Sequence, residues 1–177
     1  MPTRILMEAA APPLPQAGFF GKLPMVGDFV SRGLSPTLSA WLDNWLTQWL
    51  APVAHLPDVW PRGGIRAILD PPSGAILAVI GPSVDRAGRE FPILAGIPAC
   101  AIAQSEADRW ADLAAVALSR AVQGQYDPTT LFAALNSIAA PVAGEPALCP
   151  PLLWSANSDN PRPPEAALAE MFPRSPP

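Results

Sequence analysis

The sequence predicts the α+β fold class, as a single domain in which an antiparallel β-sheet meander packs against helices. Three β-like runs follow one another with short connections, at residues 64–70, 75–81 and 91–101. Such a succession is typical of a meander, because parallel strands need long crossovers between them. Two longer segments, 36–50 and 105–124, repeat apolar residues at helical spacing. The 177-residue chain is 50% hydrophobic, which is enough for one continuous core.

The beginning of the chain is expected to lie outside this core. Residues 1–16 are rich in Ala and Pro without periodicity, so burial cannot offset the entropy of ordering them, and they are expected to be a flexible leader. A short strand is then expected from Phe19 to Leu23. Pro24 ends it, because proline has no N–H to give to a strand ladder. A glycine-bearing loop follows to Gly33.

The segment 36–50 gives the clearest helix in the sequence. Ser35 is placed to cap its N-terminus, and Pro36 suits the first position, where the missing N–H has no intrahelical partner. Its apolar residues form two adjacent ridges, which predicts a wide stripe facing the core. The ridges are Trp41, Trp45 and Trp49, and Leu38, Leu42, Leu46 and Leu50. The indoles are expected in the core, with one of them facing a partner as the alternative.

Proline and glycine bound most of the remaining elements. Pro71–Gly74 joins the first two strands of the meander and suits a hairpin connection. Gly124 lies at the end of the second long helix, and Asp127-Pro128 is a start signal for a third. The elements expected from there onward are a helix over 128–139, a strand over 152–155, at most two helical turns within 164–172, and a tail over 173–177.

Composition and charge exclude several classes of partner. The net charge of −4 and the sequence pI of 4.8 argue against nucleic acid, because binding to phosphates needs clustered cations. Lys22 is the only lysine, which argues against a polybasic membrane patch, and the apolar stretch 93–103 is too short for membrane insertion. Glu8 interrupts the N-terminal apolar stretch, so no signal peptide is expected and the protein is expected in the cytoplasm.

The loop of residues 21–33 has an unusual sequence that begins with a Gly-Lys pair. It is not expected to be a phosphate loop, because the pair is not followed by Ser or Thr. Two interpretations stay open. In the structural one, Gly21 and Gly27 allow tight turns, the lysine is solvated, and Phe29 anchors the loop to the core. In the functional one, the loop projects charged side chains as a recognition surface, namely Lys22, Asp28 and Arg32.

A second loop, residues 82–92, carries four charges within six residues of an otherwise charge-poor chain. It is interpreted either as a solvated turn or as a contact surface. In the first case Asp85 caps the loop backbone, and Arg86 or Arg89 pairs with Glu90. In the second case the two arginines contact a partner, because a planar guanidinium suits carboxylate or phosphate recognition.

Catalytic signals are weak throughout the sequence. His55 is the only histidine, there is no GxSxG motif, and one histidine with two separated cysteines does not suggest a zinc site. No catalytic residue, metal or cofactor is therefore expected, and the protein is expected not to be an enzyme. The alternative is a small hydrolase-like enzyme with a cleft between the loops Gly21–Gly33 and Pro82–Pro92.

Two separated motifs stand out in the chain. The first is Gly18-Phe19-Phe20-Gly21-Lys22-Leu23-Pro24, followed by Gly27-Asp28-Phe29 and Arg32-Gly33; the second is Pro82-Ser83, Asp85-Arg86, Gly88-Arg89 and Phe91-Pro92. Together they resemble the signatures of the TagF family, also called ImpM, of type VI secretion accessory proteins. The helix with Trp41 and Trp45 is similar to the family's first helix, and Trp154-Ser155 resembles a C-terminal strand that often bears Trp pairs. The TagF-like domain is expected over 17–172.

This resemblance implies a cytosolic bacterial accessory protein that acts after translation, typically as a repressor, and contacts a forkhead-associated scaffold protein of the secretion system. It brings no catalytic residues. The residues expected to contact a partner are Lys22, Asp28, Arg32, Asp85, Arg86 and Arg89. The motif residues expected to have structural roles are Gly21, Pro24, Gly27, Phe29, Trp41, Trp45, Gly88, Phe91, Pro92 and Trp154.

Overall fold

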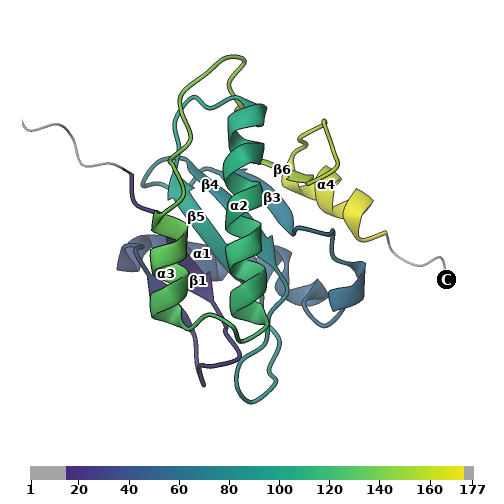
Figure 1. Ribbon diagram of the computed structural model, residues 1–177. Helices are drawn as coiled ribbons and strands as arrows, with labels where there is room; N and C mark the ends of the chain where they lie inside the picture. Colours follow the sequence, from purple (N-terminus) through teal and green to yellow (C-terminus); the bar gives the residue numbers. More distant parts are fainter. Residues whose placement is uncertain (1–14, 174–177) are drawn as a thin grey trace, which may run out of the picture.

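A computed structural model describes residues 15–173 as one six-stranded antiparallel sheet with helices on both faces (Figure 1). The strand order is β2-β1-β5-β4-β3-β6. The strands are β1 (Gly18–Gly21), β2 (Val30–Arg32), β3 (Ile65–Leu69), β4 (Ile76–Gly81), β5 (Ile93–Pro98) and β6 (Leu152–Ser155). The helices are α1 (Pro36–Trp49), the short 3-10 turns η1 (Ala51–Val53) and η2 (Pro57–Val59), α2 (Gln104–Val122), α3 (Pro128–Asn136) and α4 (Pro164–Met171).

The expected α+β fold class is confirmed, and the meander is its centre. Strands β3, β4 and β5 pair in succession, with Ile65 opposite Ile80 and Ile76 opposite Pro98. The sheet then grows at both edges through strands that are distant in sequence, since β1 pairs with β5 and β6 pairs with β3. The last strand expected from the sequence is thus the strand β6 at one edge of the sheet.

Several expected boundaries are corrected. The first strand ends at Gly21 instead of Leu23, and the third helix ends at Asn136 instead of near residue 139. The loop to Gly33 also contains the short strand β2, which pairs with β1. The expected leader over 1–16 lies outside the described residues except for its last two residues, and residues 174–177 of the expected tail also lie outside them.

The helices form two apolar layers with the sheet between them. Helices α2 and α3 cover the face seen in Figure 1, and α1 lies behind the sheet. In α1, Ser35 caps the N-terminus by accepting a hydrogen bond from the Leu38 N–H at 3.2 Å, as the sequence predicts. The leucine ridge is the buried one, because Leu42 and Leu46 are fully enclosed.

The indole ridge of α1 does not reach the core as fully as expected. Trp41, Trp45 and Trp49 are each half-buried and pack beside the leucines at the edge of the apolar layer. Two of them are in contact, since the rings of Trp45 and Trp49 have centroids 6.3 Å apart. A helix on a sheet buries only the stripe that faces the strands, and the leucines occupy that stripe.

Candidate functional site

The two loops singled out in the sequence meet in space at the lower end of the molecule in Figure 1. We call this place the loop corner, residues 22–29 and 82–92. Arginines of the second loop donate to backbone carbonyls of the first: Arg86 Nη2 to Met25 O at 2.8 Å, and Arg89 Nη2 to Gly27 O at 2.8 Å. Direct hydrogen bonds therefore join the two loops.

Backbone and hydroxyl contacts complete the junction. The Arg86 N–H donates to Val26 O at 3.0 Å, and Ser83 Oγ donates to Lys22 O at 2.7 Å. The second loop is itself closed, since Val84 and Glu90 form an isolated β-bridge. Carbonyls with fixed partners on both loops give the corner one defined shape.

Asp85 is the centre of the loop corner and is 2% exposed. Its Oδ1 accepts the N–H groups of Ala87 and Arg89, each at 2.9 Å. Its Oδ2 lies 3.2 Å from Lys22 Nζ and 2.7 Å from Arg89 Nε. Arg89 thus pairs with Asp85, and the expected pairing of an arginine with Glu90 is wrong.

The burial of Lys22 and Asp85 corrects two expectations. Lys22 is 7% exposed, so it is neither a solvated cation nor a projecting contact. Asp85 likewise does not reach the surface, because its carboxylate binds donors of the same corner, the Arg89 guanidinium and the Lys22 ammonium. Both residues hold the loops in place and present nothing outward themselves.

The surroundings of Asp85 lower its pKa. Burial would raise the pKa, but the backbone N–H of Arg89, the Lys22 ammonium, the Arg89 guanidinium and the N–H of Ala87 outweigh it and lower the pKa from 3.8 to about 2. A carboxylate with a lowered folded-state pKa stabilises the fold above its unfolded pKa. This stabilisation is lost as the pH falls from about 4 through about 2.

We therefore expect acid to weaken the wild-type protein more than an Asp85→Asn variant between pH 4 and pH 2, because asparagine cannot take up the proton. The measurement is the free energy of unfolding by denaturant at a series of pH values. Above pH 5 the difference between wild type and variant should be constant, since Asp85 is then ionised in both the folded and the unfolded state. A difference that stays constant down to pH 2 would contradict the role given to this carboxylate.

An aromatic cluster forms the apolar part of the corner. The Phe29 ring stacks on Phe20 at a centroid distance of 5.7 Å and meets Phe91 edge-on at 4.8 Å. Lys22 Nζ lies 5.2 Å from the centroid of the same ring. Although it is packed in this way, Phe29 is 43% exposed and the neighbouring Met25 is 45% exposed.

The outward side of the corner therefore differs from the set of residues expected. Its exposed large side chains are two apolar ones and four charged ones, from Met25, Asp28, Phe29, Arg86, Arg89 and Glu90. Arg32 is not brought to the corner. It lies on β2, where its Nη1 donates to Thr129 Oγ1 of α3 at 3.2 Å.

The remaining motif residues have structural positions. Gly88 has a φ of +78° and gives its N–H to Asp85 O at 2.9 Å, which closes the turn. Pro24 lies in a turn of the first loop, and Phe91 is buried beside Pro92. Trp154 is buried in β6, and its Nε1 donates to Asp108 Oδ1 at 2.8 Å.

Sequence reasoning missed the ion-pair cluster to which Trp154 belongs. Arg66 of β3 is 3% exposed and donates to the carboxylates of Asp108 and Asp112 on α2. The cluster ties the β3–β6 edge of the sheet to the helix above it. A signal was present, since Arg66 interrupts an apolar strand and the two aspartates recur at spacing four on one helix face.

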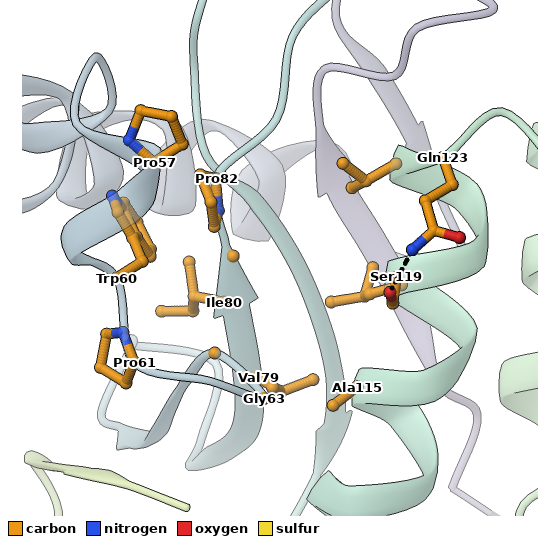
Figure 2. Close-up of a pocket in the computed structure, with 14 residues that line it drawn as sticks. Pro57, Trp60, Pro61, Gly63, Val79, Ile80, Pro82, Ala115, Ser119 and Gln123 are labelled. Carbon is orange, nitrogen blue, oxygen red and sulfur yellow. Dashed lines mark hydrogen bonds between the residues drawn. The ribbon is translucent and has the colours of Figure 1, made fainter.

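An apolar groove of about 250 Å³ lies between η2 and α2 (Figure 2). One wall is the segment 57–64, with Trp60 at its centre. The other wall is the C-terminal half of α2, around Ser119. The end of β4 lies between the walls, with the Ile80 side chain pointing toward Trp60 and the Val79 side chain pointing toward Ala115. All the residues that line it are uncharged.

Membrane-spanning helices and clustered metal ligands are both absent from the described residues. Within 15–173, none of the helices is long and apolar enough to cross a membrane. The same residues contain no group of three or more His, Cys, Asp and Glu side chains placed to hold a metal ion. His55 is exposed in the connection between η1 and η2.

Comparison with known proteins gives a family and a fold. Residues 18–138 match the family model of the TagF N-terminal domain, described as type VI secretion system-associated. Among solved structures, PA0076 from Pseudomonas aeruginosa PAO1 is similar, with a TM-score of 0.59 and 23% sequence identity over 88% of this chain and 76% of that chain. At this identity the likeness shows a shared fold. No curated protein matches the chain.

Proposed function

Because the chain belongs to the TagF N-terminal domain family of type VI secretion system-associated proteins, we propose that it is a non-enzymatic cytoplasmic repressor of that system. It acts after translation, by binding a forkhead-associated scaffold protein and holding it inactive. The loop corner is the proposed binding surface. The family assignment supports the link to secretion, and the structure of the loop corner supports the binding role.

The single observation that supports a binding role is which motif residues are buried and which are exposed at the loop corner. Lys22 and Asp85 are buried as internal supports, while Phe29 and Met25, whose carbonyl accepts a hydrogen bond from the Arg86 guanidinium, stay nearly half exposed. Large apolar side chains next to arginine are typical of the centre of protein interfaces. A corner held by fixed hydrogen bonds also loses little entropy when a partner binds.

The same geometry argues against the hydrolase-like alternative. That alternative needs a cleft between the loops Gly21–Gly33 and Pro82–Pro92, and the loops hydrogen-bond to each other there instead. The buried carboxylate where the two loops meet, Asp85, has a pKa of about 2. A general base works best with a pKa near the working pH, so Asp85 is poorly suited to that task.

The role in secretion is tested in the host bacterium. Deleting the gene of this chain is expected to raise secretion of the tube protein that the type VI system exports. Overproducing this chain is expected to lower that secretion. Secretion that stays at the wild-type level under both conditions would refute the repressor role. Secretion that falls on deletion would instead indicate a subunit needed for assembly.

The binding surface is tested with the purified forkhead-associated protein of the same host. We expect Arg86→Ala and Met25→Ala each to weaken binding by about tenfold, measured by calorimetry, because both side chains lie on the outward side of the corner. The melting temperature of Met25→Ala should change little, since exposed residues contribute little to stability. Arg86→Ala also removes the exposed hydrogen bond to Met25 O and should lower the melting temperature slightly. Lys22→Ala, in contrast, should lower the melting temperature, because it leaves Asp85 buried without its ammonium partner.

Arg32→Ala is the matched control, because Arg32 is also an exposed arginine of the motif but lies against α3. It should bind like the wild type. If Arg86→Ala, Met25→Ala and Arg32→Ala all bind as tightly as the wild type, the partner uses another surface. Loss of binding only in Arg32→Ala would move the interface to β2.

A further inference from the structure

We propose that Met25 is a redox-sensitive modification site, at which a peroxide converts the thioether to a sulfoxide and thereby weakens partner binding at the loop corner. It rests on the binding role proposed above and adds a means of regulating it. Three features of the structure lead to it: the exposure of this side chain, the hydrogen bonds that fix its backbone, and its place on the apolar part of the corner.

The Met25 side chain is open to dissolved oxidants. Within residues 15–173 the methionines are Met25 and Met171. Met25 is 45% exposed, whereas Met171 of α4 is half-buried and packs against the core on the α1 side of the sheet. Because an oxidant must reach the sulfur atom from solvent, Met25 should be oxidised first.

Hydrogen bonds on both sides of Met25 hold its side chain at the surface. Its own carbonyl accepts the Arg86 Nη2–H at 2.8 Å. The next residue is fixed as well, since the Val26 N–H donates to Leu23 O at 3.0 Å and Val26 O accepts the Arg86 N–H at 3.0 Å. Val26 packs against the core. The backbone around Met25 is therefore fixed, and the oxidised side chain would stay at the same place on the corner.

Oxidation would change the polarity of the proposed contact surface. Met25 and Phe29 are the large apolar side chains that the corner exposes, and the Phe29 ring is already packed against Phe20 and Phe91. A sulfoxide replaces an apolar thioether with a polar group that accepts hydrogen bonds. Covering that acceptor with a partner that offers no donor costs binding free energy. One of the two exposed apolar contacts would thus become unfavourable.

The chemistry needs only a peroxide as co-reactant. A lone pair of the Met25 sulfur attacks one peroxide oxygen, the S–O bond forms as the O–O bond breaks, and the departing hydroxide takes up the remaining proton and leaves as water. The sulfur loses two electrons and the peroxide gains them. Sulfoxide reductases reverse the step, in which two thiols become a disulfide and the oxygen leaves as water. The modification is therefore reversible.

The site of oxidation is tested by treating the purified full chain with hydrogen peroxide and mapping its peptides by mass spectrometry over time. We expect the Met25 peptide to gain one oxygen atom several times faster than the Met171 peptide, because only Met25 is well exposed. The melting temperature should change little, since an exposed side chain contributes little to stability. Equal rates of oxidation at the two methionines would overturn the proposal.

The effect on binding is measured by calorimetry with the untreated forkhead-associated protein of the same host, after the peroxide has been removed. We expect the oxidised chain to bind about tenfold more weakly than the unoxidised chain, and methionine sulfoxide reductase to restore the affinity. Met25→Leu is the matched control, because leucine keeps the apolar volume and cannot form a sulfoxide. It should bind within about twofold of the wild type both before and after peroxide treatment.

Met25→Leu also controls for the exposed thiols of Cys100 and Cys149, which peroxide oxidises as well. A loss of binding that this variant shares with the wild type would assign the effect to other groups and overturn the proposal. Unchanged binding of the oxidised wild type would also overturn it, although the binding role of the corner would stand if Met25→Ala still binds weakly. An unoxidised chain that does not bind the forkhead-associated protein would refute the binding role itself, and the regulation with it.

Discussion

Replacing Gly21 with alanine is expected to be among the most damaging single changes in this chain, lowering the free energy of unfolding by about 4 kcal/mol. Gly21 ends β1 with a φ of +142°, a conformation that strains other residues by about 1–3 kcal/mol. An added Cβ would lie 2.4 Å from Pro92 O and 2.7 Å from Ile93 Cα, so the backbone must also move, typically at a further 1–3 kcal/mol. The total is a large part of the 5–15 kcal/mol that stabilises a domain.

Gly27→Ala is the matched control for this prediction, because it is a glycine of the same loop. A Cβ at Gly27 meets no atom within 4 Å, so its substitution should change the free energy of unfolding by less than about 0.5 kcal/mol. Denaturant unfolding of both variants makes the comparison. Equal stability of the two would contradict the close approach of β1 to the start of β5. The expectation that Gly27 is needed for a tight turn is wrong, because Gly27 does not have the positive φ that would require glycine.

The fold could be predicted where the signal is local. Ser35-Pro36 and Asp127-Pro128 start helices through side-chain caps, and the alternation of apolar runs with Pro71–Gly74 defines a hairpin. Strand β2 could not be found in this way. It has only three residues, two of them exposed, and it exists because β1 lies beside it. A strand stabilised by pairing alone leaves little trace in the sequence.

The candidate site could be predicted in part. Both loops were identified by their unusual sequence, but the acceptors that join them are carbonyl groups of Met25, Val26 and Gly27, which any residue carries. A carbonyl has no sequence signature. For this reason the partners of Arg86 and Arg89, and with them the burial of Lys22, followed only from the structure.

The burial of the indole ridge and the position of the groove also could not be predicted from the sequence. The spacing of Trp41 and Trp45 predicts one apolar stripe, but the depth of burial depends on which part of the stripe faces the strands. The groove combines a loop, a strand end and a helix that lie far apart in the chain. Each of these three pieces has an ordinary sequence, so only their arrangement distinguishes the site.

Asp85→Asn is expected to lower the melting temperature by about 10 °C at neutral pH, the second large effect. The change keeps the shape of the side chain but removes the charge that compensates the buried Lys22 ammonium 3.2 Å away. Leaving one partner of a buried ion pair uncompensated is among the strongest destabilising changes, and in a domain of this size it shifts the midpoint by several degrees. When the amide oxygen keeps the two backbone N–H groups, the N–H₂ group takes the place of Oδ2, where the Lys22 ammonium and the Arg89 guanidinium need an acceptor. Glu90→Gln is the matched control, because Glu90 is an exposed acid of the same loop without a salt bridge among residues 15–173, and it should melt within about 2 °C of the wild type. Melting followed by circular dichroism makes the comparison. If Asp85→Asn melts with the wild type, the loop corner does not depend on this carboxylate, and its rigidity must come from the arginine-to-carbonyl bonds instead.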